Sequence, residues 1–115
     1  MQIMVLHTDF ETNSREVVAA VTYEGDDINA GLEYAYRWTN NLDGSWSQGE
    51  DFVMDGRVYE NPDYNPNVKV LAPLPTHFGR TIGHRSTSVR DIMIVEGEAY
   101  KVASFGFEKV EGFNG

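Results

Sequence analysis

Two apolar runs near the end of the chain narrow the possible folds more than any other feature. Residues 91–95 and 99–103 are both short and rich in β-branched or aromatic side chains, and they flank the turn sequence Glu96-Gly97-Glu98. Two such runs around a short segment that contains glycine are typical of a β-hairpin. We therefore expect antiparallel strands at 91–95 and 99–103.

Other segments have the same short, apolar character, which indicates further strands. They are residues 3–6, 16–23 and 68–71, and a small hairpin at 52–59 that turns at Asp55-Gly56. The first two are close enough in sequence to form a hairpin with each other. Residues 104–110 are expected to prolong the strand at 99–103 through a bulge at Gly106.

One segment has the periodicity of a helix. Its apolar face consists of Ile28, Gly31, Leu32, Ala35 and Trp38. This spacing keeps the five residues on one side of a helix. Asp26 or Asp27 can cap the first turn, and Glu33 and Arg37 are spaced for an ion pair on the outer face. We expect a helix at 28–39.

Together these segments predict an α+β fold. About five strands should form a mostly antiparallel, strongly curved sheet, barrel-like in shape, against which the one main helix packs. The 115 residues match the length of one domain, so we expect a single α+β domain at 1–115. Residues 41–67, with their Gly, Pro and Asp turns, form a long irregular loop region.

The net charge limits the classes of partner. The chain has 18 Asp and Glu against 9 Lys and Arg, a formal net charge of −9. Such a charge argues against direct binding to nucleic acid or to an anionic membrane. No run reaches the ~18 apolar residues of a membrane-spanning helix, and the first residues do not resemble a signal peptide. We expect a cytoplasmic protein that does not bind membranes.

The acids are concentrated in residues 1–65, where they predict an acidic interaction face. Its expected members, which should lie mostly exposed, are Asp26, Asp27, Glu50, Asp51, Asp55, Glu60 and Asp63. A face of this kind would attract a basic partner over a long range. The alternative is that the acidity serves solubility alone.

Residues 76–90 contain no acid. Their arginines could pair with acids of the first half of the chain, or the segment could bind an anion. The anion-binding residues would be Arg80, His84, Arg85, Ser86, Thr87 and Ser88, because arginine and hydroxyl groups are suitable donors for a phosphate or carboxylate. A third possibility is a hydrolase site around His84 and Ser86, although the chain lacks the Gly-x-Ser-x-Gly sequence of many serine hydrolases.

The chemistry of metals and cofactors has little support in the sequence. The chain has no cysteine, and its histidines are His7, His77 and His84, whose spacing matches no common metal motif. Residues 41–52 lack the glycine and glutamate positions of a calcium loop, so a turn is expected there. We expect no metal, no cofactor and no catalytic residue.

Residues 83–95 and 100–107 resemble a known pattern. Gly83-His-Arg-Ser-Thr-Ser-Val-Arg-Asp-Ile-Met-Ile-Val95, followed by Tyr100-Lys-Val-Ala-Ser-Phe-Gly-Phe107, is similar to R/H-S-x-S-V-x-D-[VI]-x-[VI]…Y-x-V-x-x-x-G-F of small bacteriophage and mobile-element proteins akin to YodL-like domains. Residues 31–40 resemble the A-x-R-x-T-N segment that often precedes it. Arg90 stands where these proteins often have Gly or Ser, which indicates that left-handed backbone geometry is not needed there.

The resemblance implies a phage or plasmid accessory protein, in some members part of an anti-restriction polyprotein, without an agreed enzymatic activity. We therefore expect a phage-encoded host-takeover or anti-defence protein of the host cytoplasm. It would act by binding a host protein rather than as an enzyme, and it could also form a homo-oligomer. The alternatives are a small-ligand or nucleotide-binding domain that uses residues 76–90, and the hydrolase with His84 and Ser86.

Overall fold

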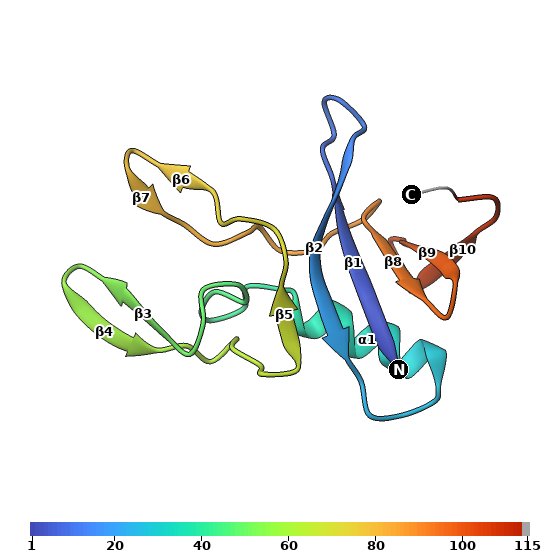
Figure 1. The fold of residues 1–115 in the computed structure, drawn as a ribbon, viewed down its shortest axis with the longest axis horizontal. Coiled ribbons are helices and arrows are strands. Elements are labelled where there is room, and N and C mark those ends of the chain that lie inside the picture. Colours follow the sequence, from blue (N-terminus) through green and yellow to red (C-terminus); the bar gives the residue numbers. More distant parts are fainter. Residues whose placement is uncertain (114–115) are drawn as a thin grey trace.

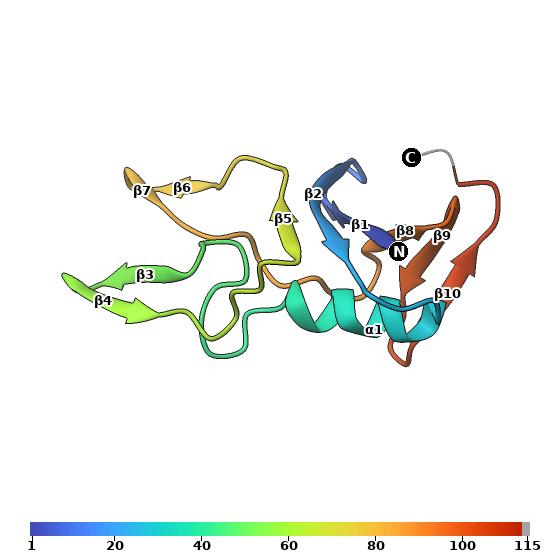
Figure 2. The same ribbon diagram turned by 60° about the horizontal axis from the view of Figure 1, so that its bottom comes forward.

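The computed structural model describes residues 1–113, with only the backbone of residues 52–54. Six strands form one antiparallel sheet in the order β10-β9-β8-β1-β2-β5 (Figure 1). Their bounds are β1 Gln2–Thr8, β2 Arg15–Thr22, β5 Val68–Val70, β8 Ile92–Val95, β9 Glu98–Val102 and β10 Phe107–Val110. The helix α1, Ile28–Trp38, crosses one face of this sheet (Figure 2). The predicted α+β class is confirmed.

The sheet is open, so the prediction of a barrel-like closure is wrong. Within the described residues, β10 and β5 are its two edges and do not pair with each other. β5 is only three residues long and lies between Pro66 and Pro73, which lack the N–H group that a continuing ladder needs. The main sheet has six strands, close to the expected number of about five.

The hairpin predicted at 91–103 is confirmed. β8 pairs with β9 from Ile92↔Lys101 to Val95↔Glu98. The connecting residues Glu96 and Gly97 have φ angles of 53° and 77°, the left-handed geometry that tight hairpin turns require. Beyond β9 the prediction fails, because Gly106 (φ 71°) reverses the chain. β10 is therefore a separate strand that pairs antiparallel with β9 rather than an extension of it.

α1 begins and ends close to its predicted bounds. The side chain of Asp27 accepts a hydrogen bond from the backbone N–H of Ala30 at 3.1 Å, which satisfies one of the free donors of the first turn. Thr39 forms the C-terminal cap. Arg37 does not show the predicted pairing with Glu33, and its Nη2 lies instead 3.3 Å from Oδ1 of Asp63.

Two small hairpins extend from the end of the molecule where α1 ends (Figures 1 and 2). One consists of β3 (Asp51–Met54) and β4 (Arg57–Glu60), which confirms the hairpin predicted at 52–59. The other consists of β6 (Thr76–His77) and β7 (Arg80–Thr81). It turns at Phe78 and Gly79, which both have positive φ.

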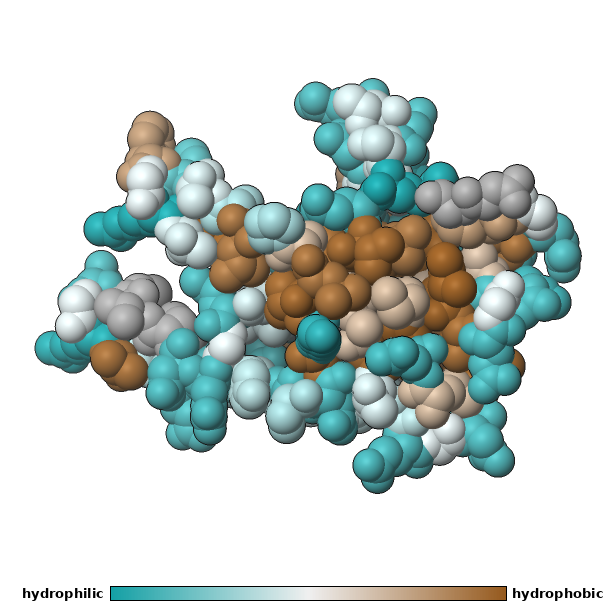
Figure 3. All heavy atoms as spheres, viewed as in Figure 1, coloured by the Kyte–Doolittle hydropathy of each residue, from teal (hydrophilic) through white to brown (hydrophobic). Residues whose placement is uncertain are grey.

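The main core fills the space between the sheet and α1. Its fully buried members include Ile3, Val5, Val21, Leu32, Ala35, Met93 and Val95. Trp46 continues this core beyond the end of α1, with 2% of its surface exposed. Apolar side chains also cover the opposite face of the sheet (Figure 3). α1 is neither long nor apolar enough to cross a membrane, and the described residues contain no other helix that could.

Candidate functional site

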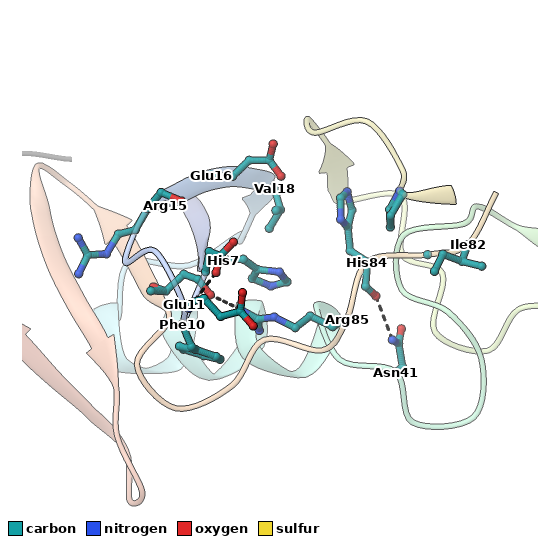
Figure 4. Close-up of a pocket in the computed structure, with 15 residues that line it drawn as sticks. His7, Phe10, Glu11, Arg15, Glu16, Val18, Asn41, Ile82, His84 and Arg85 are labelled. Atoms are coloured by element: carbon teal, nitrogen blue, oxygen red, sulfur yellow. Dashed lines mark hydrogen bonds between the residues drawn. The ribbon is translucent and has the colours of Figure 1, made fainter. Parts of the chain in front are cut away.

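An open groove of about 1100 Å³ lies beyond the end of α1, between the turn that joins β1 to β2 and residues 82–85 (Figure 4). We call it the His7–His84 groove. His7 comes from β1 and His84 from the segment on the facing side. Only 9% of His7 and 8% of His84 is exposed. Two nearly buried histidines in one open groove make it the candidate site.

A chain of hydrogen bonds fixes the tautomer of His7. The hydroxyl of Thr39 donates to the carbonyl of Ala35 at 2.7 Å, and the hydroxyl of Thr87 donates to Thr39 Oγ1 at 2.8 Å. Thr87 has then used its only proton, so its oxygen must accept from His7 Nε2, which lies 2.9 Å away. His7 therefore carries its proton on Nε2 and a lone pair on Nδ1.

The neutral form of His84 has the same tautomer for a simpler reason. Its Nε2 lies 3.1 Å from the carbonyl oxygen of Ala72, and a carbonyl can only accept a hydrogen bond. The indole ring of Trp46 stacks on the His84 ring at 5.8 Å and meets the His7 ring edge-on at 6.1 Å. Both imidazole rings are thus held in fixed orientations.

Burial lowers the pKa of His7 from 6.5 to about 4. The cation of Arg85 and the neighbouring His84 act in the same direction, whereas Asp91 opposes them. His7 is therefore neutral at pH 7, which makes its Nδ1 a hydrogen-bond acceptor.

The free energy of unfolding should consequently fall as the pH is lowered from 6.5 to 4. Over this interval the unfolded chain takes up a proton on residue 7 and the folded protein does not, which costs up to about 3 kcal/mol. His7→Gln, which has no titrating ring, should flatten this interval in urea unfolding curves recorded at pH 7, 5.5 and 4. If the free energy of unfolding of His7→Gln falls as steeply between pH 6.5 and 4 as that of the wild type, a group other than His7 is responsible for the pH dependence.

Asp91 lies behind the groove and holds two of its lining residues, Arg85 and Thr8, in place. Its fully buried carboxylate binds Arg85 with both oxygens, at 2.6 Å from Nη1 and 2.9 Å from Nη2. It also accepts the backbone N–H groups of Thr8 and Ser88, each at 2.8 Å. Burial alone would raise the pKa of Asp91, but Arg85 and these two N–H groups bring it below its ordinary value.

The structure brings five of the six predicted anion-binding residues together, and the side chains of Arg85, Ser86, Thr87 and Ser88 all bind groups of this chain. Arg85 is paired with Asp91, rather than with an acid of residues 1–65. Thr87 is part of the His7 chain, and Ser86 Oγ accepts from the N–H of Asn41 at 2.8 Å. Ser88 Oγ lies 3.4 Å from Arg85 Nη1.

The remaining predicted anion-binding residue, Arg80, is exposed on β7 and does not line the groove. For the predicted hydrolase, His84 Nε2 is bound to Ala72. In the part of the chain that the structure describes, no hydrogen bond joins His84 to Ser86.

The predicted acidic face is divided. Asp26 and Asp27 are exposed at the beginning of α1, whereas the four exposed acids at 50–60 lie on or beside the β3–β4 hairpin, beyond the other end of α1 (Figure 2). Six of the seven acids are exposed, as the prediction of a mostly exposed set requires, and Asp63 is the exception, with only 1% exposed. The seven acids therefore do not form one continuous face.

Asp63 is buried because the backbone surrounds it with donors. The N–H groups of Leu42, Asp43 and Gly44 all donate to its Oδ2, at 2.8, 2.9 and 2.7 Å. Burial tends to raise the pKa of Asp63, but these three donors and Arg37 lower it below its ordinary value. The turn expected near residues 41–45 is thus closed around a carboxylate of the same chain.

The segments that carry the resemblance contact each other. The N–H of Thr87 donates to the carbonyl of Thr39 at 2.9 Å, so the end of α1 is joined to the segment before β8. Arg90 has a φ of 81°, so the expectation that this position avoids left-handed geometry is wrong. Its guanidinium lies 4.6 Å from the centre of the Phe10 ring, an attractive contact that favours arginine at this position.

Comparison with protein-family models, with curated proteins and with solved structures gives no match. Among the described residues, no three side chains of His, Asp or Glu are grouped closely enough to hold a metal ion. The chemistry of the groove must therefore be argued from its own groups.

Proposed function

We propose that the protein binds a basic segment of a partner protein in the His7–His84 groove. The observation that carries this proposal is that two carboxylates of the groove have no partner in the described part of the chain. Glu11 and Glu16 both line the groove and are exposed. Within residues 1–113, neither carboxylate has an ion-pair or hydrogen-bond partner.

Two cations line the groove, and Arg15 is an exposed one that has no ion pair within residues 1–113. Arg85 is paired with Asp91, and the guanidinium of Arg15 lies 5.2 Å from the centre of the Phe113 ring. Asp9 accepts the N–H groups of its own turn, from Glu11 at 2.9 Å and from Thr12 at 3.4 Å. With Arg85 neutralised by Asp91, the three acids Asp9, Glu11 and Glu16 outnumber the remaining cation Arg15, and this excess favours a cation over a phosphate or another anion.

The resemblance to bacteriophage and mobile-element proteins supports the idea that this binding takes place in a cell infected by a phage or carrying a mobile element. In that setting the chain is a phage-encoded accessory protein, and its partner is a host protein with an exposed basic segment, such as a component of host defence. Direct binding to nucleic acid has less support, because the unpaired carboxylates of the groove and the net charge of −9 repel phosphates.

A basic peptide that contains arginine should therefore bind the protein, and the double variant Glu11→Gln/Glu16→Gln should weaken binding about tenfold, through the loss of two charge contacts. The matched control is Glu24→Gln/Asp26→Asn, which removes the same charge from two exposed residues before α1. Fluorescence anisotropy at 50 and 200 mM salt measures both effects, and affinity should fall with salt. Equal weakening in the control, or binding of an acidic peptide instead, would contradict the proposal.

A further inference from the structure

The two histidines of the groove each have one nitrogen without a partner. Both Nε2 atoms are used, by Thr87 and by the Ala72 carbonyl. No group of residues 1–113 binds either Nδ1, and neither Nδ1 is among the fully enclosed polar atoms that lack a partner. Each Nδ1 therefore keeps some exposed surface, and the groove is the open space that both residues line.

These two nitrogens are matched acceptors. The hydrogen-bond pattern gives both rings the same tautomer, with a lone pair on Nδ1, and the ring centres are 6.4 Å apart with their planes at 89°. Water in the open groove can donate to both acceptors, so a ligand that displaces this water must replace its hydrogen bonds. Such a ligand must offer at least two N–H or O–H donors.

A carboxylate stands beside the histidine pair. Glu16 lies directly opposite His7 in the β1–β2 ladder, so their side chains project from the same face of the sheet, about 5 Å apart at Cβ. Glu16 has no partner in the described part of the chain. In the neutral form of both rings, two acceptors and one negative charge together select a cation with several donors.

Among such cations, the guanidinium group of arginine fits best. A metal ion is disfavoured because, in the described part of the chain, no three ligating side chains are close enough together. The ammonium of lysine is a compact charge, whereas guanidinium is planar and presents five N–H donors in several directions. Val18, Pro75 and Ile82 also line the groove, and they can cover the aliphatic part of an arginine side chain.

We infer that the floor of the His7–His84 groove binds the guanidinium group of one arginine side chain of the partner segment, with the two Nδ1 atoms and Glu16 as acceptors. This inference rests on the proposed function. It adds a distinction between arginine and lysine that a merely acidic surface does not make.

The test uses a short peptide with a single central arginine and its counterparts with lysine or citrulline at that position. His7→Gln and His84→Gln are suitable variants, because the glutamine amide keeps an N–H donor near the position of Nε2 but has no atom in place of Nδ1. We expect the arginine peptide to bind about tenfold more tightly than the lysine peptide, and each variant to remove most of this preference. Free arginine should bind much more weakly than the peptide if the ligand is a partner segment.

A second readout does not depend on the variants folding normally. In the wild-type protein, ¹⁵N spectra of the imidazoles should show both rings protonated on Nε2, and the arginine peptide should shift both Nδ1 signals as they accept hydrogen bonds. Equal binding of arginine and lysine peptides, with unchanged Nδ1 signals, would overturn this inference and leave the proposed function intact. Failure of every basic peptide to bind would overturn both.

Discussion

Asp91→Ala is expected to lower the free energy of unfolding by about 3–5 kcal/mol, the range for removing one partner of a buried ion pair. The substitution leaves the guanidinium of Arg85 without its carboxylate and the N–H groups of Thr8 and Ser88 without an acceptor. Because a domain of this size has about 5–15 kcal/mol of stability in total, the variant should be close to unfolding. Urea denaturation at pH 7 measures the effect.

Two control variants and the pH dependence of stability test this explanation. Asp91→Asn keeps a carbonyl acceptor and should lose less stability than Asp91→Ala. Glu33→Ala, an exposed change on α1, should remain within about 0.5 kcal/mol of the wild type. Since the folded protein holds the pKa of Asp91 below its ordinary value of 3.8, this contribution is present at pH 7 and is lost as the pH falls below about 4. A loss under 1 kcal/mol for Asp91→Ala would mean that the pair is not formed in solution.

Asp63→Ala is expected to lower the free energy of unfolding by about 2–4 kcal/mol, because three partly buried N–H donors lose their acceptor. The same change removes the carboxylate that faces Arg37. The damage should be local, so amide hydrogen exchange should show the largest loss of protection at Leu42, Asp43 and Gly44. Urea denaturation gives the free energy of unfolding of the same variant.

The neighbouring exposed acid Asp43 provides the matched control. Asp43→Ala removes a carboxylate from the same turn but leaves the acceptor in place, so it should change the free energy of unfolding by less than about 0.5 kcal/mol. Asp63→Asn should be intermediate, because its carbonyl can still accept from the backbone. If Asp43→Ala and Asp63→Ala have the same effect, the carboxylate of Asp63 is not the organising group of this turn.

The elements that were predicted correctly depend on local sequence. The helix at 28–38 follows from apolar spacing and an aspartate cap, and the hairpin at 92–102 follows from two β-rich runs around Glu96-Gly97. Both signals lie within a few residues, where backbone preference and side-chain periodicity act directly. The order of the strands and the open shape of the sheet depend on contacts between distant segments, which such signals do not contain.

The candidate site was only partly predictable for the same reason. Residues 84–88 could be identified as a polar, acid-free segment. Their side chains form hydrogen bonds with residues outside this segment, such as Thr39 and Asp91, and these partners could not be identified from the sequence. Asp63 lies in an acid-rich stretch, and only the folded backbone of 42–44 explains its burial. His7 was noted as one of three histidines without a metal spacing, and its approach to His84 arises from the packing of β1 against the segment before β8.

The position of β1 in the sheet has a consequence for how the chain folds during synthesis. β1 pairs with β2, which follows at once, and also with β8, so that Ile3 lies opposite Val95. Contacts between such distant residues slow folding, because a long loop must close before they form. On the ribosome, β1 keeps one unpaired edge until most of the chain has emerged. The nascent β1–β2 hairpin is therefore the stage at which this protein is most exposed to mispairing with other chains.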